Sequence, residues 1–365
     1  MQLRTLSCYK PIAQIALARK GRRVPRASTV SEMLGVNFER EIYEQPDVWR
    51  HIAESDKART LAGAIRDHDV VLIGTGSSLF VAQLGAVALR RRGINAHALA
   101  ATESVLDHVA YQHAAVIACS RTGESADLLQ ALDIIEPKQL IALTNSVDST
   151  LAQRAELCID IGAGPELAVP ASKSVTAMAA VLLWAAGLMA GKATRSAQSL
   201  VDTAEDVRSW LEGKGVEDVR RAALRIARRR SVIIAATGYG LPVAHEFALK
   251  LKEASYIHAE GYSAGELRHG SAAMLDAGCA IIGIVDDTAR NIVNQPLAEA
   301  EEAECLRYTI GGRLANVPLL GPVVGEAFNA LAWLVAGQAI ALHVGRARYV
   351  ESDAPRGLVR LLRQG

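Results

Sequence analysis

One pattern recurs along the chain: a short apolar run, a turn of glycine and hydroxyl residues, and then a helical period. Residues 70–73 lead into Gly74-Thr-Gly-Ser-Ser78 and a helix, and residues 115–119 lead into Ser120-Arg-Thr-Gly-Glu-Ser125 and another helix. Apolar runs at 140–143 and 157–161 continue the alternation. Strands that alternate with helices build a parallel sheet whose site lies at the carboxyl ends of the strands. The first half is therefore predicted to be a doubly wound α/β sheet.

The same pattern restarts in the second half, after a charged helical stretch that begins near residue 200. Residues 231–236 are followed by Thr237-Gly-Tyr-Gly240 and a helix, and Thr237 stands 162 positions after Thr75. A fixed offset of this kind indicates a duplicated domain. The later apolar run at 280–285 leads instead into Asp286 and Asp287, whose charges would repel a phosphate. Only the first copy is therefore expected to bind one.

The ends of the chain differ from the two repeats. Residues 1–30 carry seven basic side chains and no acidic one, which predicts a disordered tail, with a transit peptide as the alternative. Residues 31–52 predict an amphipathic helix that Pro46 ends, followed by a second helix. We expect a basic tail at 1–30, a first domain at 31–195, a second at 205–350 and a C-terminal tail at 351–365 that reaches the active site.

Composition excludes several classes of partner. Forty Lys and Arg against 39 Asp and Glu leave a net charge of +1, which argues against nucleic-acid binding. Five scattered cysteines without a CxxC pair indicate neither disulfides nor zinc and fit a reducing cytoplasm. The most apolar run, residues 175–190, is too short to cross a bilayer and predicts a buried helix. A small molecule is the expected partner.

Two loops have the composition of an anion site. In residues 74–78 and 120–125, small residues permit close approach, and hydroxyls with main-chain N–H groups can hold a phosphate at a helix start. The sequence contains neither GxxxxGK[ST] nor a GxGxxG that opens a helix, which disfavours ATP and NAD. Each loop alone fits ordinary helix capping equally well. Two in consecutive units favour the anion site.

The densest polar stretch runs from residue 246 to residue 269. Glu246, Lys250 and Glu253 are spaced at i, i+4 and i+7, so one helical face carries acid, base and acid. From spacing alone this is either a surface ladder of salt bridges or the lining of a cleft, and the apolar residues on the other faces favour the cleft. A carboxylate held there can transfer protons. His258 and His269 flank a glycine-containing loop, and either could be structural.

The run from Ala248 to Gly270 closely resembles the isomerase domain of glucosamine-6-phosphate synthase and its relatives in the sugar isomerase (SIS) family. Segments 41–46, 120–128 and 163–177 resemble the family's entry helix, phosphate loop and substrate loop, in the same order. The resemblance covers residues 33 to 360. It implies two tandem SIS domains, each a doubly wound, flavodoxin-like parallel sheet flanked by helices, that act on an amino-sugar phosphate.

The resemblance also implies roles for particular residues. Glu253 would move the proton between C1 and C2, His269 would open the sugar ring from a neighbouring subunit in a homodimer, and Lys250 would complete the catalytic group. Arg360 stands where the family has a catalytic lysine, and arginine can supply charge but does not readily lose its proton. The residues expected to hold the substrate and its phosphate are Gly76, Ser77, Ser120, Arg121, Thr122, Ser125, Val169, Ala171 and Glu246.

Two departures from the synthase decide the expected activity. About thirty residues precede the isomerase-like part, with Cys8 inside a basic tail, so glutamine-dependent synthesis is not expected. Ala171 replaces the synthase serine and resembles the family's stand-alone deaminases. The expectation is a cytoplasmic glucosamine-6-phosphate deaminase that forms fructose 6-phosphate and ammonia without a metal or organic cofactor. The alternatives are an isomerase or deglycase of another hexose phosphate, such as a fructosamine 6-phosphate, and a non-catalytic phosphosugar-binding regulator.

Overall fold

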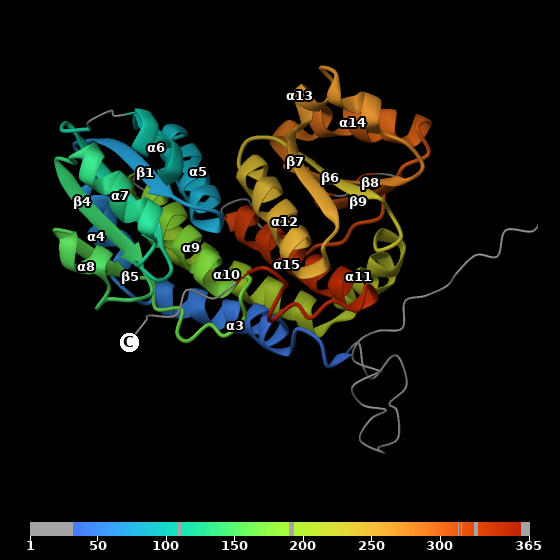
Figure 1. Cartoon of the computed structure of the whole chain (residues 1–365), viewed down its shortest axis with the longest axis horizontal. Helices are drawn as coiled ribbons and strands as arrows, with labels where there is room; N and C mark the ends of the chain where they lie inside the picture. Colours follow the sequence, from blue (N-terminus) through green and yellow to red (C-terminus); the bar gives the residue numbers. More distant parts are fainter. Residues whose placement is uncertain are drawn as a thin grey trace, which may run out of the picture.

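The computed structural model describes residues 32–358, apart from 108–110, 190–192, 313, 315 and 325–327. The expected basic tail at 1–30 and the predicted site residue Arg360 lie outside the described residues. Two parallel β-sheets, each with helices on both faces, lie side by side, and long helices run between and beneath them (Figure 1).

The first sheet has the strand order β2-β1-β3-β4-β5, with every neighbouring pair parallel. This is the flavodoxin-like order, and it confirms the predicted fold class. The four predicted strands are present with boundaries shifted by one residue at most. The fifth, β2, was not predicted because its sequence, AHALA, has no β-branched residue. The strands are β1 (Asp69–Gly74), β2 (Ala96–Ala100), β3 (Ala114–Ser120), β4 (Gln139–Thr144) and β5 (Leu157–Asp160).

Both faces of this sheet are covered. In β1, Val70 and Leu72 pack into the main core, whereas Val71 and Ile73 pack into a second cluster on the opposite face. A parallel sheet needs this double cover, which explains why its strands read as continuous apolar runs. The main-core face is covered by α4 (Lys57–Ala64), α5 (Ser77–Arg90) and α9 (Lys173–Met189), and the other by α6 (Ala101–Asp107), α7 (Ala126–Ile135) and α8 (Thr150–Arg154).

The second sheet repeats the order of the first four strands, as β7-β6-β8-β9, again all parallel. Its strands are β6 (Ser231–Ala236), β7 (His258–Ser263), β8 (Cys279–Val285) and β9 (Leu306–Gly311). On the core side lie α12 (Gly240–Ser255) and α15 (Asn329–Ala347), and on the other α13 (Ala264–Leu267) and α14 (Arg290–Glu302), with short 3₁₀ turns η1 (Ser271–Met274) and η2 (Asp287–Ala289). The duplication indicated by the sequence offset is therefore a repeated topology.

The N-terminal helix corrects one prediction. α3 (Val36–Ala53) runs without interruption through Pro46, where the sequence predicted a break. Proline cannot donate to the carbonyl four residues earlier, which is that of Ile42. The side-chain amide of Gln45 donates to this carbonyl at 3.2 Å, so the lost hydrogen bond is replaced. Gln45 and Pro46 are both buried, and packing around them keeps the helix straight enough to continue.

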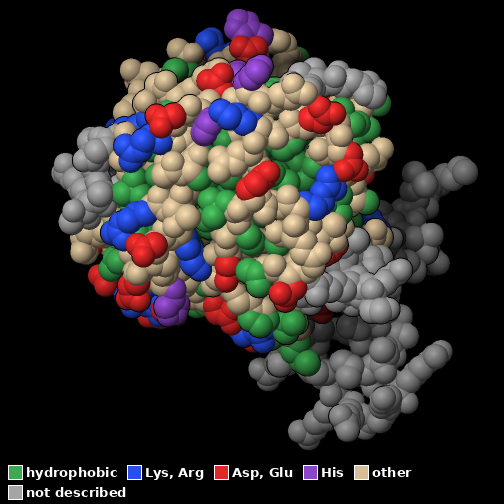
Figure 2. Space-filling model, turned by 90° about the vertical axis from the view of Figure 1, so that its left-hand side faces the viewer, with side chains coloured by type: hydrophobic (Ala, Val, Ile, Leu, Met, Phe, Trp, Pro, Cys, Tyr) green, Lys and Arg blue, Asp and Glu red, His purple; other side chains and the backbone are tan. Residues whose placement is uncertain are grey.

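The two halves share one core. α10 (Ala193–Glu212) and α11 (Lys214–Ile226) form the predicted helical connection; α3 packs on α10 and α9, and α15 packs on α12 and α11. α9, predicted as a buried helix, is buried along most of its length. α15 is long and apolar enough to cross a membrane, but 94% of its apolar window is buried inside the protein, as in a core helix. The face seen in Figure 2 carries acidic and basic side chains interspersed.

The sheets meet through equivalent helices. α5 follows β1 and α12 follows β6, and these two helices pack against each other. Gln83 Oε1 lies 3.4 Å from His245 Nδ1, and these two residues are 162 positions apart, the offset that relates Thr75 to Thr237. Phe80 also contacts the His245 ring. Because equivalent residues of the two repeats contact each other, an approximate two-fold axis relates the two sheets. The starts of α5 and α12 lie on facing sides of the two halves.

Candidate active site

The two predicted anion loops lie side by side. They follow β1 and β3, which are neighbours in the sheet, so both loops sit at its carboxyl edge. A Cβ on Gly74 would lie 2.6 Å from the backbone of Ser78, and Gly76 has a φ of 53°, so the turn into α5 requires glycine at both. Ser125 is the N-cap of α7. The N-termini of α5 and α7 therefore open at the strand-order switch between β1 and β3, where ligands bind in such sheets.

Hydroxyl groups fix the second loop from within. Ser120 Oγ accepts a hydrogen bond from the Gly123 amide at 2.9 Å, and Thr122 Oγ1 accepts one from the Glu124 amide at 3.3 Å. Gly123 has a φ of 66°, and a Cβ there would lie 2.0 Å from Ser149 Oγ. The loop is thus held in one shape with its main-chain groups oriented by its own side chains.

The acid–base–acid face of α12 is buried. The Lys250 ammonium pairs with Glu253 and lies 3.5 Å from Glu246 Oε1. The Lys250 and Glu246 side chains are 1% and 2% exposed, whereas that of Glu253 is 18% exposed. The alternative of a surface ladder is therefore wrong. The three charges lie inside the protein, and Glu253 is the member that a ligand can reach.

Burial controls ionisation in this group. It raises the pKa of Glu246 to about 7, and the Glu253 charge adds to the rise, while Lys250 and the Ser77 hydroxyl partly offset it. For Lys250, burial would lower the pKa, but the carboxylates of Glu246, Glu253 and Glu166 outweigh burial and raise it. Lys250 therefore stays protonated at neutral pH. Because Ser77 belongs to the first sheet's loop, the two halves meet at Glu246.

Glu166, which the sequence analysis did not single out, is a buried residue of the substrate-loop segment 163–177. Its buried carboxylate accepts hydrogen bonds from the Ser172 and Ser174 amides, at 2.8 and 3.1 Å, and from Ser174 Oγ at 2.6 Å. Arg121 Nη1 lies 3.2 Å from Glu166 Oε2. Burial alone would raise the pKa of Glu166, but the Arg121 charge and these hydrogen bonds lower it, so the group is ionised.

Glu41 of α3 holds the same segment from the other side. Its buried carboxylate accepts hydrogen bonds from the amides of Leu167 and Ala168. Desolvation raises the pKa of Glu41. The sequence offered a signal for Glu166, which is the one carboxylate in segment 163–177, whereas Glu41 shares segment 41–46 with Glu44. We call Arg121, Glu166, Glu246, Lys250 and Glu253 the charge cluster.

The remaining predicted residues fall outside the charge cluster. Val169 donates its amide to the Asp353 carbonyl at 3.0 Å, and Ala171 packs partly buried against the main core. His269 is exposed just after α13, and among the described residues no side-chain hydrogen bond or ion pair ties it to α12. Its donation from a partner subunit stays a prediction.

The C-terminal segment runs back over the first half. Asp353 accepts hydrogen bonds from the Asn37 and Phe38 amides at the start of α3, at 2.9 and 2.8 Å. The Arg356 guanidinium lies 4.4 Å from the centre of the Tyr256 ring, at the end of α12. The C-terminal segment thus contacts the start of α3 and the end of α12, and its described part ends at residue 358.

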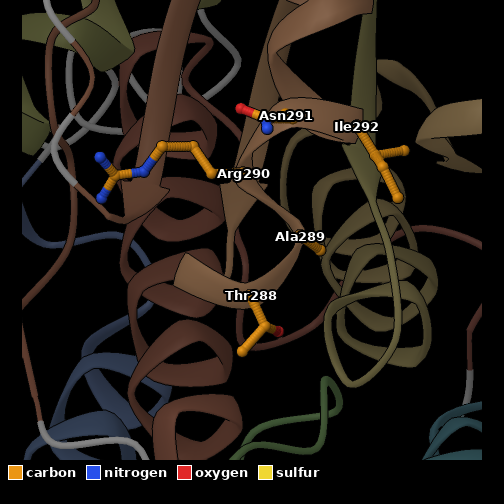
Figure 3. A pocket seen from close by; sticks show the side chains of 5 residues that line it. All are labelled: Thr288, Ala289, Arg290, Asn291 and Ile292. Carbon is orange, nitrogen blue, oxygen red and sulfur yellow. The ribbon is translucent and has the colours of Figure 1, made fainter.

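A cavity of about 630 Å³ lies in the second sheet, at the start of α14. It is lined by Thr288, Ala289, Arg290, Asn291 and Ile292, and the Arg290 and Ile292 side chains point to opposite sides (Figure 3). The cavity lies just after β8, the strand of the second sheet that is equivalent to β3, so its place in the fold corresponds to that of the loop at residues 120–125. None of its lining residues was a predicted site residue, and Asp286 is engaged in capping the Thr288 amide at 3.1 Å.

Comparison with known families identifies the repeated unit. The model of the SIS domain matches residues 65–188 and 225–306, together more than half of the chain. The chain belongs to the SIS domain family. The first matched segment contains the whole first sheet, and the second contains β6, β7 and β8 of the second sheet, so the SIS domain is present in tandem, as the resemblance implied.

Relatives of this SIS protein are enzymes of sugar phosphates. It is 28% identical over 343 residues to a glutamine–fructose-6-phosphate aminotransferase (isomerizing) of Thermococcus kodakarensis, covering 88% of this chain and 57% of the relative. The chain spans about half the length of the curated relatives it matches.

Solved structures share the fold. A glucosamine-6-phosphate deaminase from Thermotoga maritima is 21% identical with a TM-score of 0.75, covering 88% of this chain and 98% of that one. A tagatose-6-phosphate ketose/aldose isomerase from Escherichia coli is 20% identical with a TM-score of 0.77, covering 92% and 98%. At these identities the likeness establishes the arrangement of elements alone.

Proposed function

We propose that this SIS protein is a glucosamine-6-phosphate deaminase that releases fructose 6-phosphate and ammonia without glutamine. The observation that carries the proposal is the junction of the two sheets. A buried ammonium and two carboxyl groups lie together on α12, Glu246 interacts with Ser77 of the first anion loop, and only Glu253 among the three is partly open to a ligand. An anchored phosphate and a nearby carboxylate are what proton transfer on a sugar phosphate requires.

The phosphate would bind at the N-termini of α5 and α7. The main-chain N–H groups there, with the hydroxyls of Ser77, Thr122 and Ser125, supply donors, and the helix dipoles favour negative charge. The rest of the sugar would then extend toward α12. His269 of a partner subunit would assist ring opening in the homodimer, and Arg360 would supply positive charge.

Glu253 would remove the proton at C2 of the open sugar and return it at C1. This shift converts the amino aldehyde into an imine at C2, and addition of water then releases ammonia and leaves the ketose. Lys250 remains protonated and pairs with Glu253, so it holds that side chain in place before and after the proton is taken up. One carboxylate that reaches both carbons is sufficient for the transfer.

The test is ammonia release coupled to fructose 6-phosphate formation from glucosamine 6-phosphate, with no glutamine present. Glu253→Gln should lower kcat by roughly a thousandfold with a substrate Kd within a few-fold of the wild type. Glu205→Gln, at an exposed position on α10, is the matched control and should keep full activity. Turnover of another hexose phosphate alone would reassign the substrate, and tight binding without turnover would indicate a regulator.

A further inference from the structure

The Arg121 side chain was expected to hold the phosphate, but in the structure it faces inward. Arg121 Nη1 lies 3.2 Å from Glu166 Oε2, and the two side chains are 20% and 1% exposed. The Arg121 carbonyl is also fixed, because it accepts hydrogen bonds from Asn145 N at 3.2 Å and Thr144 Oγ1 at 3.3 Å. Arg121 is therefore anchored at both its backbone and its guanidinium.

Glu166 needs this partner. A carboxylate so deeply buried is costly to ionise without a compensating cation. Its hydrogen bonds to Ser172 and Ser174 set the start of α9, and its charge acts on Lys250 across the junction between the sheets. Arg121 is thus paired with Glu166 and Lys250 with Glu253, and the Glu166 charge acts on Lys250 between the two pairs.

We infer that Arg121 is a positioning residue, which pairs with Glu166 and keeps its charge acting on Lys250 so that Lys250 orients Glu253, and is not a ligand of the substrate phosphate. This inference deepens the proposed function and rests on it for its kinetic test. On this view the main chain and hydroxyls of the loop bind the phosphate. The charge of Arg121 instead supports Lys250, which positions Glu253 for the proton transfer.

The inference predicts a split between binding and turnover. Arg121→Gln should lower kcat about tenfold or more while the Kd for fructose 6-phosphate, measured by calorimetry, stays within about threefold. A guanidinium bound directly to the phosphate would give the opposite result, because loss of a charge-assisted hydrogen bond weakens binding by roughly 10- to 100-fold. Thr122→Val is the contrasting variant and should weaken binding instead.

The double variant Arg121→Gln, Glu166→Gln covers the case in which Arg121→Gln folds poorly. Removing Arg121 alone takes away the cation that is paired with the buried Glu166 carboxylate, so the melting temperature should fall by roughly 5 °C or more, and the second substitution should restore more than half of the loss. The double variant should bind fructose 6-phosphate normally and remain slow, because Lys250 still lacks the Glu166 charge.

The outcomes separate the two proposals. Weakened binding in the double variant, or a melting temperature no higher than that of Arg121→Gln, would overturn the role of Arg121. A wild type that binds the sugar phosphate but releases no ammonia would overturn the deaminase, while the binding and melting measurements still decide the role of Arg121. Restored melting temperature with unchanged binding supports the inference in either case.

Discussion

Glu246 gives a sharp quantitative prediction, because burial changes its ionisation strongly between the folded and unfolded chain. The carboxyl is buried at the junction of the sheets, and its pKa rises from the ordinary 4.5 to about 7. Between these values the folded protein holds a proton that the unfolded chain has released. Stability contributed at this site is therefore lost as pH rises from about 4.5 to about 7, and little changes above that.

The size of the loss follows from the two pKa values. One pKa unit corresponds to about 1.4 kcal/mol, and a change from pH 5 to pH 8 crosses most of the interval, so the wild type should lose about 2.5 kcal/mol through Glu246. Glutamine has the same shape and does not titrate. The unfolding free energy of Glu246→Gln minus that of the wild type should therefore rise by about 2.5 kcal/mol from pH 5 to pH 8.

Urea unfolding at both pH values measures this difference, because other titrating groups are common to the two proteins and cancel. Glu205→Gln, in which the replaced carboxylate is 61% exposed, is the control and should follow the wild type. If the difference between Glu246→Gln and the wild type stays constant within about 0.5 kcal/mol from pH 5 to pH 8, the description of this site is wrong.

Three further predictions test the fold and the assembly. Gly123→Ala should cost about 2–4 kcal/mol of unfolding free energy, because Gly123 has a positive φ and no room for a Cβ. The control Gly63→Ala, which has open space on α4, should cost nothing, and equal melting temperatures of the two variants would contradict this. If a partner subunit donates His269, mixing inactive Glu253→Gln and His269→Ala proteins with subunit exchange should restore about a quarter of the activity, and no recovery would argue against donation. Burial lowers the pKa of His343 to about 4, so stability should fall by about 3 kcal/mol as pH drops from 6.5 to 4, and His343→Gln should lose this dependence in urea unfolding.

Most of the strands that the sequence revealed are buried on both faces of their sheet, although the partly exposed edge strand β5 was also predicted and the buried strand β9 was not. Residues 70–73 and 231–236 are continuous apolar runs because each side chain packs against a helix layer. β7, with the sequence HAEGYS, lies at the edge of its sheet and is partly exposed, so its pattern carries no strand signal. Pro46 misled the prediction for a related reason, since the replacement hydrogen bond from Gln45 depends on a local geometry that propensity does not encode.

The candidate site was likewise predicted from the sequence only in part. The spacing of Glu246, Lys250 and Glu253 placed three charges on one helical face, and the motif resemblance named Glu253 before any coordinates. Spacing alone could not show whether that face was exposed, and it favoured neither the burial of Lys250 nor the contact of Glu246 with Ser77. Glu166 was passed over because its ion-pair partner, Arg121, lies 45 positions away in the sequence.

The sequence by itself determined the elements, their parallel arrangement, the duplication and the family, because these depend on local periodicity and on motifs that are contiguous in the chain. Only the tertiary structure decided that Arg121 turns inward to Glu166, that Glu246 meets the first sheet's loop, and that burial shifts the ionisation of the charge cluster. Those features depend on distances between residues far apart in sequence and on the loss of water around them, and neither is written in any single segment.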